Sequence, residues 1–534
     1  MKPTLAQSRA REYRRPGGPW DRGSLDASFP LAASKAVVAN GMSLDGKELD
    51  ALVSQVAGGL LATGAGRGKV VTWQLANGIP ALTLYRACWR IGAVAAPLHH
   101  RMGPSEVAGA LAQVEPTVVL SDPDLPAAGI SGALELERPL DPNSLLGTLR
   151  PASSYPAAAC PSRGSDIAVA LFTSGSTGVP KAVLHTHRGL GYKACLMAEV
   201  HGLRSTDALL MPAPLAHVSG LLNGVLMPAV TGLPSVLMSR WDPEEALTLI
   251  HEEKVSFVGA PPVFFAQMAG ARSFSRARVA SLRLVSTGGA SVSPAFVDST
   301  SERFGCRVKR TYGSTEAPTV TTSGPADPPE RARDTDGRPV GEVELTLRNP
   351  GTGKHVPPGV EGEIWLRGPE LFAGYADADA TARVVSRPGG WYRSGDLGVL
   401  DEGGWLRVSG RISDIIIRAG ENISAAEVEA VLESHPAVRQ AVAIGVPDAR
   451  LGERVAAVVV AGSAFGLQEC RELFESKGVT RFKTPELVIA VEEMPVLAAG
   501  KPDRAALRKL AFRFADAGEG PILREPGDPA PSAT

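Results

Sequence analysis

Residues 167–187, "IAVALFTSGSTGVPKAVLHTH", join two apolar runs by a loop of small polar residues. The first run, 167–173, has the length and composition of a buried strand, and residues 181–187 are expected to continue it after the loop. Residues 173–178 contain two glycines and four serines or threonines, and a proline and a lysine follow shortly after. The stretch therefore predicts a strand, loop, strand element with hydrogen-bond donors concentrated in the loop.

This loop is suited to holding a polyphosphate. Glycine-rich loops turn several backbone N–H groups toward one point, and hydroxyl groups and a lysine add further donors. Composition alone leaves a plain polar surface loop as an equal alternative. The spacing excludes two other loops. Lys181 follows Pro180 and precedes Ala182, unlike the lysine of a Walker A motif, and Ser174 stands where the G-x-S-x-G turn of hydrolases needs its first glycine.

The length and charge of the chain limit its organisation and its partners. Its 534 residues exceed what one hydrophobic core supports, so we expect at least two domains. Hydrophobic residues make up 44% and charged residues 21%, as in globular proteins. Lys plus Arg total 55 and Asp plus Glu total 56, so no overall field attracts nucleic acid or anionic lipid. We therefore expect no nucleic-acid partner, and the sequence leaves open whether the chain forms a homo-oligomer.

The cysteines and the apolar segments bear on the cellular compartment. The five cysteines occur singly, without a CxxC pair, which favours neither a disulfide framework nor a zinc cluster. The N-terminal residues lack the apolar segment of a secretory signal, and no stretch approaches the roughly 20 apolar residues of a membrane span. We therefore expect a cytoplasmic protein without a membrane span.

Apolar runs of strand length alternate with helical patterns through most of the chain, which indicates an α/β fold of layered sheets and helices. Residues 283–305 illustrate the pattern. They predict a strand, a glycine turn and a helix, with Ser293 as the N-cap and Pro294 at the first helical position.

The pattern restarts toward the C-terminus with the short strands and helices of a separate α+β domain of roughly 100 residues. Ser424 and Glu427 are expected to satisfy each other's amides in a capping box. Residues 516–534 are rich in proline and glycine and predict a disordered tail. We therefore expect a large N-terminal α/β domain over 1–412 and a small C-terminal domain over 413–515.

The stretch "TSGSTGVPK" (173–181) resembles the phosphate-binding signature of the adenylate-forming (ANL) superfamily, which includes acyl-CoA synthetases, firefly-type luciferases and the adenylation domains of peptide synthetases. Further motifs that resemble those of this superfamily follow in its order and span most of the chain: "PLAHVSG" (214–220), "STGGA" (286–290), "TYGSTE" (311–316), "WYRSGDLG" (391–398), "GRISDIIIRAGENISAAEVE" (410–429) and "AAGKPDR" (498–504). By this resemblance the chain is identified as a member of the AMP-dependent synthetases and ligases, the family of the acyl-CoA synthetases.

The resemblance implies a reaction in two halves, with ATP, Mg²⁺ and coenzyme A as cofactors. A carboxylate attacks the α-phosphorus of ATP to give an acyl-adenylate and pyrophosphate, and the thiol of coenzyme A then takes the acyl group. Because both partners in the first half are anions, the site must neutralise charge and hold the reacting groups in line.

The resemblance assigns the phosphates and the metal to two of these motifs. Glu316 would bind Mg²⁺, a cation usually held by one or two carboxylates together with substrate phosphates, and Thr315 would reach the α-phosphate. Outside its motif a single glutamate would be taken for solvated surface. The residues assigned to the β- and γ-phosphates are Thr173, Ser174, Gly175, Ser176, Thr177, Gly178 and Lys181.

The nucleoside is assigned to further motifs. Asp396 would accept hydrogen bonds from both ribose hydroxyls, because an ionised carboxylate is purely an acceptor. Arg411 would add a ribose or phosphate contact. Tyr312, the tyrosine of "TYGSTE", has two possible roles, as a contact of the adenine or as an aromatic residue of the core. By the resemblance, the adenine would lie between Tyr312 and the turn formed by Gly288, Gly289 and Ala290.

Lys501, in "GKPDR", is the lysine that the resemblance places at the substrate carboxylate and the α-phosphate, and a surface lysine is the alternative. Because it belongs to the small domain, that domain is expected to be mobile, closing for the first half of the reaction and turning for the second. The hinge falls at Ser413, and Asp414 is left open between a strand cap and a site residue. Gly420 would lie on the path of the pantetheine arm, which the methyl group of Ala419 would narrow.

His217, in "PLAHVSG", is either a packed core histidine or, by the resemblance, a wall or gate of the acyl pocket with a part in catalysis. Peptide synthetases often present an aspartate in this segment, and the lack of an acid there disfavours an amino acid substrate. Residues 220–227 and 259–268 are expected to supply apolar pocket walls, with Phe264 setting the depth. We therefore expect an apolar carboxylic acid that is medium-chain, alicyclic or aromatic.

Three functions remain in view at this point. An ATP-dependent acyl-CoA synthetase leads, and the alternatives are an adenylation enzyme that loads a carrier protein and a non-catalytic relative that binds nucleotide or acyl-CoA. "GGAS" (288–291) superficially resembles a carrier attachment site, but it lies in the expected adenine turn, and no carrier-sized segment follows Phe514. The residues that speak against a non-catalytic relative are Lys181, Glu316, Asp396 and Lys501.

Overall fold

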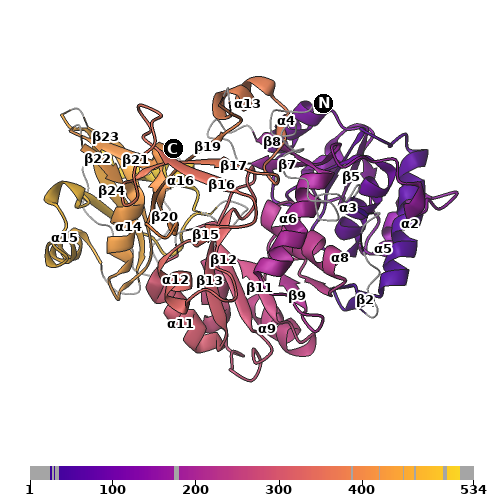
Figure 1. Ribbon diagram of the computed structural model, residues 1–534, viewed down its shortest axis with the longest axis horizontal. Helices are drawn as coiled ribbons and strands as arrows, with labels where there is room; N and C mark the ends of the chain where they lie inside the picture. The colour runs from indigo at the N-terminus through magenta and orange to yellow at the C-terminus, as the bar shows by residue number, and fades with distance from the viewer. Residues whose placement is uncertain are drawn as a thin grey trace. The chain divides into compact units, whose positions relative to one another are not determined.

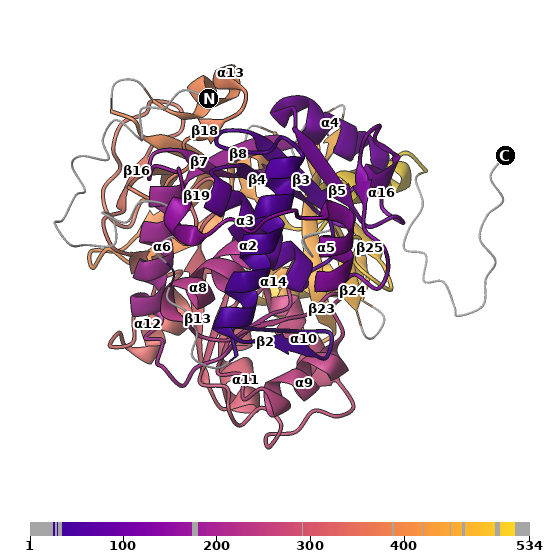
Figure 2. The ribbon, with the colours of Figure 1, turned by 90° about the vertical axis from the view of Figure 1, so that its right-hand side faces the viewer.

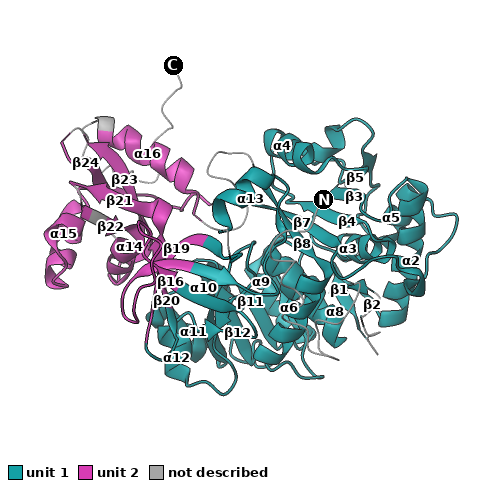
Figure 3. Cartoon of the chain, turned by 45° about the horizontal axis from the view of Figure 1, so that its top comes forward, with its two compact units in different colours: residues 1–346, 365–393, 402–406 teal, residues 347–364, 394–401, 407–534 magenta. Residues whose placement is uncertain are grey.

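The computed structural model describes residues 25–26, 29, 35–173, 180–290, 292–386, 389–419, 421–448, 450–461, 465–496 and 502–517. The chain forms two compact units (Figure 3). Because the chain passes between them more than once, the expected single boundary between residues 412 and 413 stays a prediction. Unit 1 comprises Met1–Thr346, Trp365–Arg393 and Glu402–Leu406, and unit 2 comprises Leu347–Ile364, Ser394–Asp401 and Arg407–Thr534.

A seven-stranded sheet of unit 1 contains the element predicted over 167–187. Its order is β18-β8-β7-β4-β3-β5-β6, and β7 and β8 pair antiparallel on either side of the loop. β8 ends at Thr186, whose hydroxyl caps helix α6 by accepting a hydrogen bond from the N–H of Gly189 at 3.1 Å. The two predicted strands are confirmed, with His187 in the helix, and residues 174–179 of the predicted loop lie outside the described residues. The strands are β3 (Val70–Gln74), β4 (Val94–Leu98), β5 (Val118–Ser121), β6 (Leu134–Glu135), β7 (Ile167–Thr173), β8 (Lys181–Thr186) and β18 (Gly374–Tyr375).

A nine-stranded sheet forms a second layer of unit 1, with the order β15-β14-β13-β12-β11-β9-β10-β1-β2. The strands from β13 to β1 are parallel, so their connections are crossovers, several of which contain helices. The helix predicted within 283–305 is confirmed as α11, whose N-cap Ser293 accepts a hydrogen bond from the N–H of Phe296 at 3.2 Å. The strands are β1 (Val37–Ala39), β2 (Met42–Leu44), β9 (Leu209–Met211), β10 (Ser235–Leu237), β11 (Phe257–Ala260), β12 (Leu284–Gly288), β13 (Arg307–Tyr312), β14 (Thr321–Thr322) and β15 (Arg338–Pro339).

Helices cover the faces of these sheets (Figure 1). Alternate residues of one strand enter different hydrophobic clusters. Leu209 and Met211 share a cluster with α2 and α3, whereas Leu210 shares one with α9, α10 and α11. The expected large α/β domain of layered sheets and helices is therefore confirmed. The helices of unit 1 are α2 (Gly46–Ala62), α3 (Ile79–Ile91), α4 (Pro104–Val114), η4 (Pro126–Gly129), α5 (Pro142–Leu149), η5 (Ala157–Ala159), α6 (His187–Val200), α7 (Val218–Gly220), η6 (Leu221–Leu226), α8 (Met227–Thr231), α9 (Pro243–Glu252), α10 (Pro262–Gly270), α11 (Pro294–Phe304), α12 (Pro329–Asp334) and α13 (Ala378–Val384).

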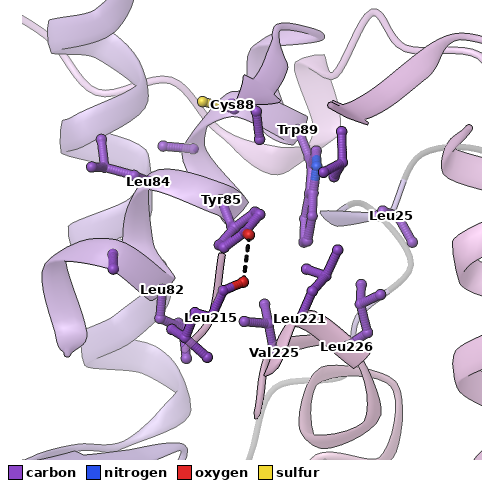
Figure 4. Close-up of a cluster of buried hydrophobic side chains, with 14 of the residues drawn as sticks. Leu25, Leu82, Leu84, Tyr85, Cys88, Trp89, Leu215, Leu221, Val225 and Leu226 are labelled. Atoms are coloured by element: carbon purple, nitrogen blue, oxygen red, sulfur yellow. Dashed lines mark hydrogen bonds between the residues drawn. The ribbon is translucent and has the colours of Figure 1, made fainter. Parts of the chain in front are cut away.

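Helix α3 is buried along its whole length and contacts elements of both sheets. The hydroxyl of Tyr85 donates a hydrogen bond to the carbonyl of Leu215, just after β9, at 2.7 Å (Figure 4). Trp89 donates from Nε1 to the carbonyl of Ala168 on β7 at 3.1 Å. Helix α2 runs beside α3 (Figure 2). Helix α3 thus contacts the seven-stranded sheet and the segment that follows β9 of the nine-stranded sheet.

Unit 2 contains a five-stranded sheet that carries helices on both faces. Its order is β22-β21-β24-β23, and β25 pairs with β24. On β24, Val455 and Val459 pack toward α14 and α15, whereas Val458 packs toward α16. The expected α+β domain is confirmed. Its elements are η7 (Ile412–Asp414), β21 (Ile415–Arg418), β22 (Glu421–Ser424), α14 (Ala425–Glu433), β23 (Val438–Asp448), β24 (Gly452–Ala461), α15 (Leu467–Ser476), η8 (Arg481–Lys483), β25 (Leu487–Ala490) and α16 (Arg504–Ala517).

The structure differs from the predictions at two places in unit 2, the start of α14 and the end of α16. Helix α14 begins after its N-cap Ser424, whose hydroxyl accepts a hydrogen bond from the N–H of Glu427 at 3.4 Å. The carboxylate of Glu427, expected to complete the capping box, accepts hydrogen bonds from Lys483 Nζ at 2.6 and 2.8 Å. Helix α16 reaches Ala517, so the first residues of the expected tail are helical. Residues 518–534 lie outside the described residues.

A four-stranded sheet of order β16-β17-β19-β20 contributes residues to each unit. It carries two of the candidate residues, because Asp396 lies on β19 and Arg411 ends β20. The strands are β16 (Glu344–Arg348), β17 (Gly362–Arg367), β19 (Tyr392–Leu400) and β20 (Leu406–Arg411).

The buried carboxyl of Glu433, at the end of α14, makes the stability of unit 2 depend on pH. Burial raises its pKa from 4.5 to about 7. Between these values the folded state holds a proton that the unfolded state has lost, so the free energy of unfolding falls as the pH rises to about 7 and then levels off. Glu433→Gln is therefore expected to stabilise unit 2 at pH 8 by on the order of 1–3 kcal/mol and to leave it nearly unchanged at acidic pH.

Hydrogen exchange of the α14 and β23 amides, followed by mass spectrometry across this pH range, measures the difference. The substitution keeps the oxygen that accepts from the N–H of Ala441 at 3.2 Å. Glu475→Gln, which removes an exposed carboxylate from α15, is the control. Equal protection of wild type and Glu433→Gln at pH 8 would contradict the prediction.

Candidate functional site

The register of three strands brings Lys181, His185 and Tyr375 to one face of the seven-stranded sheet. In the β7–β8 pair Lys181 lies opposite Thr173, and in the β8–β18 pair Val183 lies opposite Tyr375. Alternate residues of a strand share a face, and directly opposed residues point the same way. The side chains of the lysine, the histidine and the tyrosine therefore lie along the same face.

The loop after β13 meets this face at Thr315 and Glu316. The hydroxyl of Tyr375 donates a hydrogen bond to Glu316 Oε1 at 2.7 Å. One residue earlier, the carbonyl oxygen of Thr315 lies 2.7 Å from His185 Nε2. Lys181 Nζ lies 5.5 Å from the centroid of the Tyr375 ring. The structure thus brings together Lys181, Thr315 and Glu316, to which the sequence resemblance assigned the phosphates and the metal.

His185 and Tyr375 also belong to this cluster, although neither was among the residues predicted from the sequence. His185 follows Lys181 by four residues on a strand, so strand alternation was the signal that could have placed both on one face. Tyr375 had no comparable signal, because its neighbours depend on the long-range pairing of β18 with β8.

His185 and Tyr375 both act as neutral hydrogen-bond donors here. Burial lowers the pKa of His185 to about 4, although the Thr315 carbonyl and the charge of Glu316 oppose the shift. A neutral imidazole has one N–H, which must be on Nε2 if the ring donates to the carbonyl of Thr315. Burial also raises the pKa of Tyr375 far above its ordinary value, and the charge of Glu316 adds to the rise. The tyrosine therefore keeps the proton that it donates to Glu316.

Glu316 and Lys181 have the chemistry that a magnesium–polyphosphate group needs. Glu316 is partly exposed, and among the described residues its second oxygen, Oε2, has no hydrogen-bond or ionic partner. In the same part of the chain, Lys181 Nζ has no carboxylate partner. Mg²⁺ usually takes one or two protein carboxylates together with substrate phosphates, and a lysine serves phosphate as a point charge. The two residues therefore fit the group that the resemblance assigns to them.

The expected adenine residues lie at the carboxyl ends of neighbouring parallel strands. Gly288, the last residue of β12, is paired with Thr311 on β13, and Tyr312 follows. A Cβ on Gly288 would lie 2.2 Å from the carbonyl oxygen of Thr311, so only glycine fits there. Gly289 has a φ of +77°, in the left-handed region that favours glycine, and Gly289 and Ala290 are exposed. The turn presents backbone without bulk beside the strand that ends in the tyrosine.

Asp396, expected at the ribose, and Arg411, expected at the ribose or a phosphate, are paired with each other in unit 2. Arg411 Nε lies 2.8 Å from Asp396 Oδ1, and the Asp396 side chain is 6% exposed whereas that of Arg411 is 57% exposed. The N–H of Asp396 donates to the hydroxyl of Ser394 at 3.0 Å. The pair presents the arginine outward and holds the carboxylate behind it. Their contact with a ribose stays a prediction.

His217 precedes the short helix α7, and its ring packs against another imidazole. The centroids of His217 and His99 are 5.0 Å apart, and His99 stacks on His100 at 4.5 Å. The two segments expected to line a pocket, 220–227 and 259–268, are adjacent. A Cβ added to Gly259 in the second segment would lie 2.8 Å from Asn223 Nδ2 in the first. Phe264 belongs to a buried cluster, with its ring 4.6 Å from that of Trp241. The part of Phe264 and His217 in an acyl pocket stays a prediction.

Residues near the expected hinge have structural partners in unit 2. Asp414 Oδ2 lies 3.3 Å from Arg504 Nε, and the hydroxyl of Ser413 donates to Asp414 Oδ1 at 3.1 Å. These contacts support the structural alternative for Asp414. Ala419 has a φ of +50°, a conformation that favours glycine, and its N–H donates to the carbonyl of Leu451 at 2.6 Å. The candidate residues that lie outside the described residues are Ser174, Gly175, Ser176, Thr177, Gly178, Gly420 and Lys501.

Two segments of the chain match known protein families. Residues 31–376 match the family described as AMP-binding enzyme, and residues 427–501 match the AMP-binding enzyme C-terminal domain. The chain belongs to the AMP-binding enzyme family. The resemblance to the adenylate-forming (ANL) superfamily is thereby confirmed.

Known relatives and solved structures cover nearly the whole chain. The medium-chain fatty-acid–CoA ligase of Escherichia coli (strain K12) is 33% identical over 552 aligned residues, which cover 96% of this chain and 95% of the relative. A feruloyl-CoA synthase of an Amycolatopsis species is 33% identical, with 89% of this chain and 95% of the relative covered. The structure of ATP-bound MatB from Rhodopseudomonas palustris aligns with a TM-score of 0.82 and 27% identity, over 90% of this chain and 97% of MatB. The two ligases are named for different acids.

Two observations concern membrane-spanning helices and the cysteines. Within the described residues, no helix has the length and apolar character that crossing a membrane requires. All five cysteines lie among the described residues, and none of them is in a disulfide. The expected cytoplasmic location stays a prediction.

Substitution of Gly288 tests whether the turn formed by Gly288, Gly289 and Ala290 contributes to ATP binding. Gly288→Ala forces β12 and β13 apart at the position where the new Cβ meets the carbonyl of Thr311. Because small displacements in a binding site have large effects, we expect the affinity for ATP to fall about tenfold or more, with a loss of stability of about 1–3 kcal/mol from overpacking. Equilibrium binding of ATP and thermal unfolding measure the two effects.

Gly270→Ala is the matched control, because a Cβ on Gly270, at the end of α10, meets no atom within 4 Å. That variant is expected to bind ATP as the wild type does. An unchanged ATP affinity in Gly288→Ala would show that the turn is not part of the nucleotide site.

Proposed function

We propose that the protein is an ATP-dependent acyl-CoA synthetase that activates an apolar carboxylic acid, either medium-chain, alicyclic or aromatic, and transfers the acyl group to coenzyme A. The observation that carries the proposal is the meeting of Glu316, Tyr375 and Lys181, contributed by separate segments of unit 1. ATP, Mg²⁺ and coenzyme A are the cofactors of the CoA ligases in this family.

The first half of the proposed reaction depends on charge neutralisation by the residues of this cluster. Bound magnesium supplies positive charge to the phosphates. Glu316 would hold the metal through its carboxylate, one oxygen of which accepts the hydrogen bond of Tyr375. Lys181, at the end of the glycine loop, offers its ammonium group to the departing phosphates. Cations held beforehand where charge accumulates lower the barrier without further reorganisation.

The substrate class is inferred from the segments around His217. Of the residues of η6, Leu221, Leu222, Val225 and Leu226 are buried and apolar. Residues 214–220 contain no acid that would bind a substrate ammonium group. Both observations favour an acid without a second charge. The names of the relatives give varied acids, which supports acyl-CoA synthesis in general rather than one substrate.

The activity is tested with a panel of carboxylic acids. Purified protein with Mg·ATP is expected to release pyrophosphate with medium-chain, alicyclic or aromatic monocarboxylates, and mass spectrometry is expected to find the acyl-CoA thioester when coenzyme A is added. Pyrophosphate release with a thioester only on a carrier protein would establish the carrier-loading alternative. No nucleotide consumption with any acid would leave the non-catalytic relative.

Lys501 is proposed to act in the first half of the reaction only. Lys501→Ala is expected to reduce acyl-adenylate formation about 10²–10³-fold, the usual cost of losing one preorganised charge-stabilising group. Thioester formation from preformed acyl-adenylate is expected to be largely spared. Single-turnover measurements of pyrophosphate and of thioester separate the two halves.

The control is Lys509→Ala, which removes an exposed lysine from α16 in the same segment of the chain. It is expected to leave both halves unchanged. Equal losses in both halves for Lys501→Ala would refute the specific role of this lysine.

A further inference from the structure

We propose that Tyr375 is a positioning residue that fixes the metal-binding carboxylate of Glu316, an inference that rests on the proposed function. Its hydroxyl lies 2.7 Å from Glu316 Oε1. None of the sequence motifs that assigned the other residues contains this tyrosine. Its role is to orient a ligand and not to touch the reacting atoms.

The two carboxylate oxygens of Glu316 have different surroundings. Tyr375 occupies Oε1, whereas Oε2 has no partner among the described side chains and backbone groups. A neutral hydroxyl that donates to one oxygen fixes the rotamer of the carboxylate and leaves its negative charge in place. Partners of this kind, behind a metal ligand, set the orientation of that ligand and hence the affinity for the metal.

Tyr375 is itself held by several contacts. Its strand β18 pairs with β8, and just before it the N–H of Ala373 donates to the carbonyl of Leu184 at 2.6 Å. The ring of Phe372 lies 5.1 Å from both Tyr375 and Tyr392. Together with the strand pairing, this aromatic contact fixes the ring of Tyr375 beside Glu316.

The same short segment also holds the backbone of Glu316. The N–H of Phe372 donates to the carbonyl of Glu316 at 2.8 Å, so the segment grips both the main chain and the side chain of the glutamate. Upstream, Lys193 Nζ lies 3.0 Å from Glu370 Oε1, and both side chains are almost fully buried. Removing either partner would leave an uncompensated buried charge, so this pair fixes the start of the segment.

Lys181 couples the glycine loop to the same ring. Its Nζ lies 5.5 Å from the ring centroid of Tyr375, where a cation is attracted by the face of an aromatic ring. Tyr375 therefore contacts the two charged groups, one positive and one negative, that the proposed reaction uses.

The experiment compares metal-bound and metal-free nucleotide in Tyr375→Phe. The substitution removes the hydroxyl and keeps the ring, its face toward Lys181 and the strand pairing. With Mn²⁺ as the probe, the Kd for Mn²⁺·ATP in the absence of acid is expected to rise about 10–100-fold, the usual effect of losing such a partner. The Kd for ATP in EDTA is expected to stay unchanged, which a general loss of structure would not produce.

Two further variants isolate the contact. In a double-mutant cycle, Tyr375→Phe is expected to add little to the loss already caused by Glu316→Gln, because the hydroxyl acts through that carboxylate. Tyr155→Phe is the control, since its hydroxyl donates to the carbonyl of Ala159 at 2.8 Å in an exposed segment. It is expected to bind both forms of the nucleotide as the wild type does.

Each outcome separates this inference from the proposed function. An unchanged Kd for Mn²⁺·ATP in Tyr375→Phe, or an equal loss with and without metal, overturns the positioning role even if the wild type makes acyl-CoA. If Tyr375→Phe does not fold, Tyr375→Leu, which also lacks the hydroxyl, replaces it, and an unchanged Kd for Mn²⁺·ATP there overturns the role. A wild type that forms no thioester but loses Mn²⁺·ATP affinity on substitution supports the role and refutes the synthetase.

Discussion

The hydrogen bonds that hold the loop after β13 against the seven-stranded sheet are the constraint on which the candidate site depends. Glu316 is bound through its side chain by Tyr375 and through its carbonyl by Phe372, and the carbonyl of Thr315 is bound by His185. A carboxylate on an unsupported loop would sample several rotamers. Here it is fixed by groups on the seven-stranded sheet and in the segment that leads into β18, so its position is determined by the packing of the whole unit.

Buried charges set the arrangement of the elements around this contact. Arg90 Nε lies 2.6 Å from Asp26 Oδ2 with both side chains fully buried, and Lys193 is paired with Glu370 in a similar environment. Such pairs are a weak source of net stability, because desolvation offsets their attraction. They are intolerant of rearrangement, however, since a separated partner would remain charged inside the protein. Unit 1 therefore combines an apolar core with a few ionic contacts that allow one arrangement of its segments.

The local patterns of the sequence identified most of the secondary structure. The strands over 167–187, the helix after Ser293 and the small α+β domain were predictable, because apolar periodicity, N-caps and prolines act over short distances. The carboxylate of Glu427 was misassigned for the opposite reason. Its partner Lys483 is distant in the sequence, and only the folded chain brings the two together.

The same contrast between short-range patterns and long-range contacts applies to the candidate site. Lys181, Thr315 and Glu316 were found through motifs, but no short-range pattern indicated that Tyr375 would reach Glu316 from β18. Likewise, Asp396 was assigned to the ribose and Arg411 to the ribose or a phosphate, whereas their pairing with each other depends on β19 and β20 lying in one sheet. Residue types revealed the chemistry, and the contacts that orient those residues required the tertiary structure.

The sheet of unit 2 has a consequence for how such proteins diversify. Both of its sides are shielded by helices from its own stretch of chain, so the stretch carries a complete core. A segment of this kind meets the physical requirement for a cassette that gene recombination can transplant without baring apolar surface. Recombination at the ends of this segment would join it to a different nucleotide-binding domain, and its hydrophobic core would remain intact.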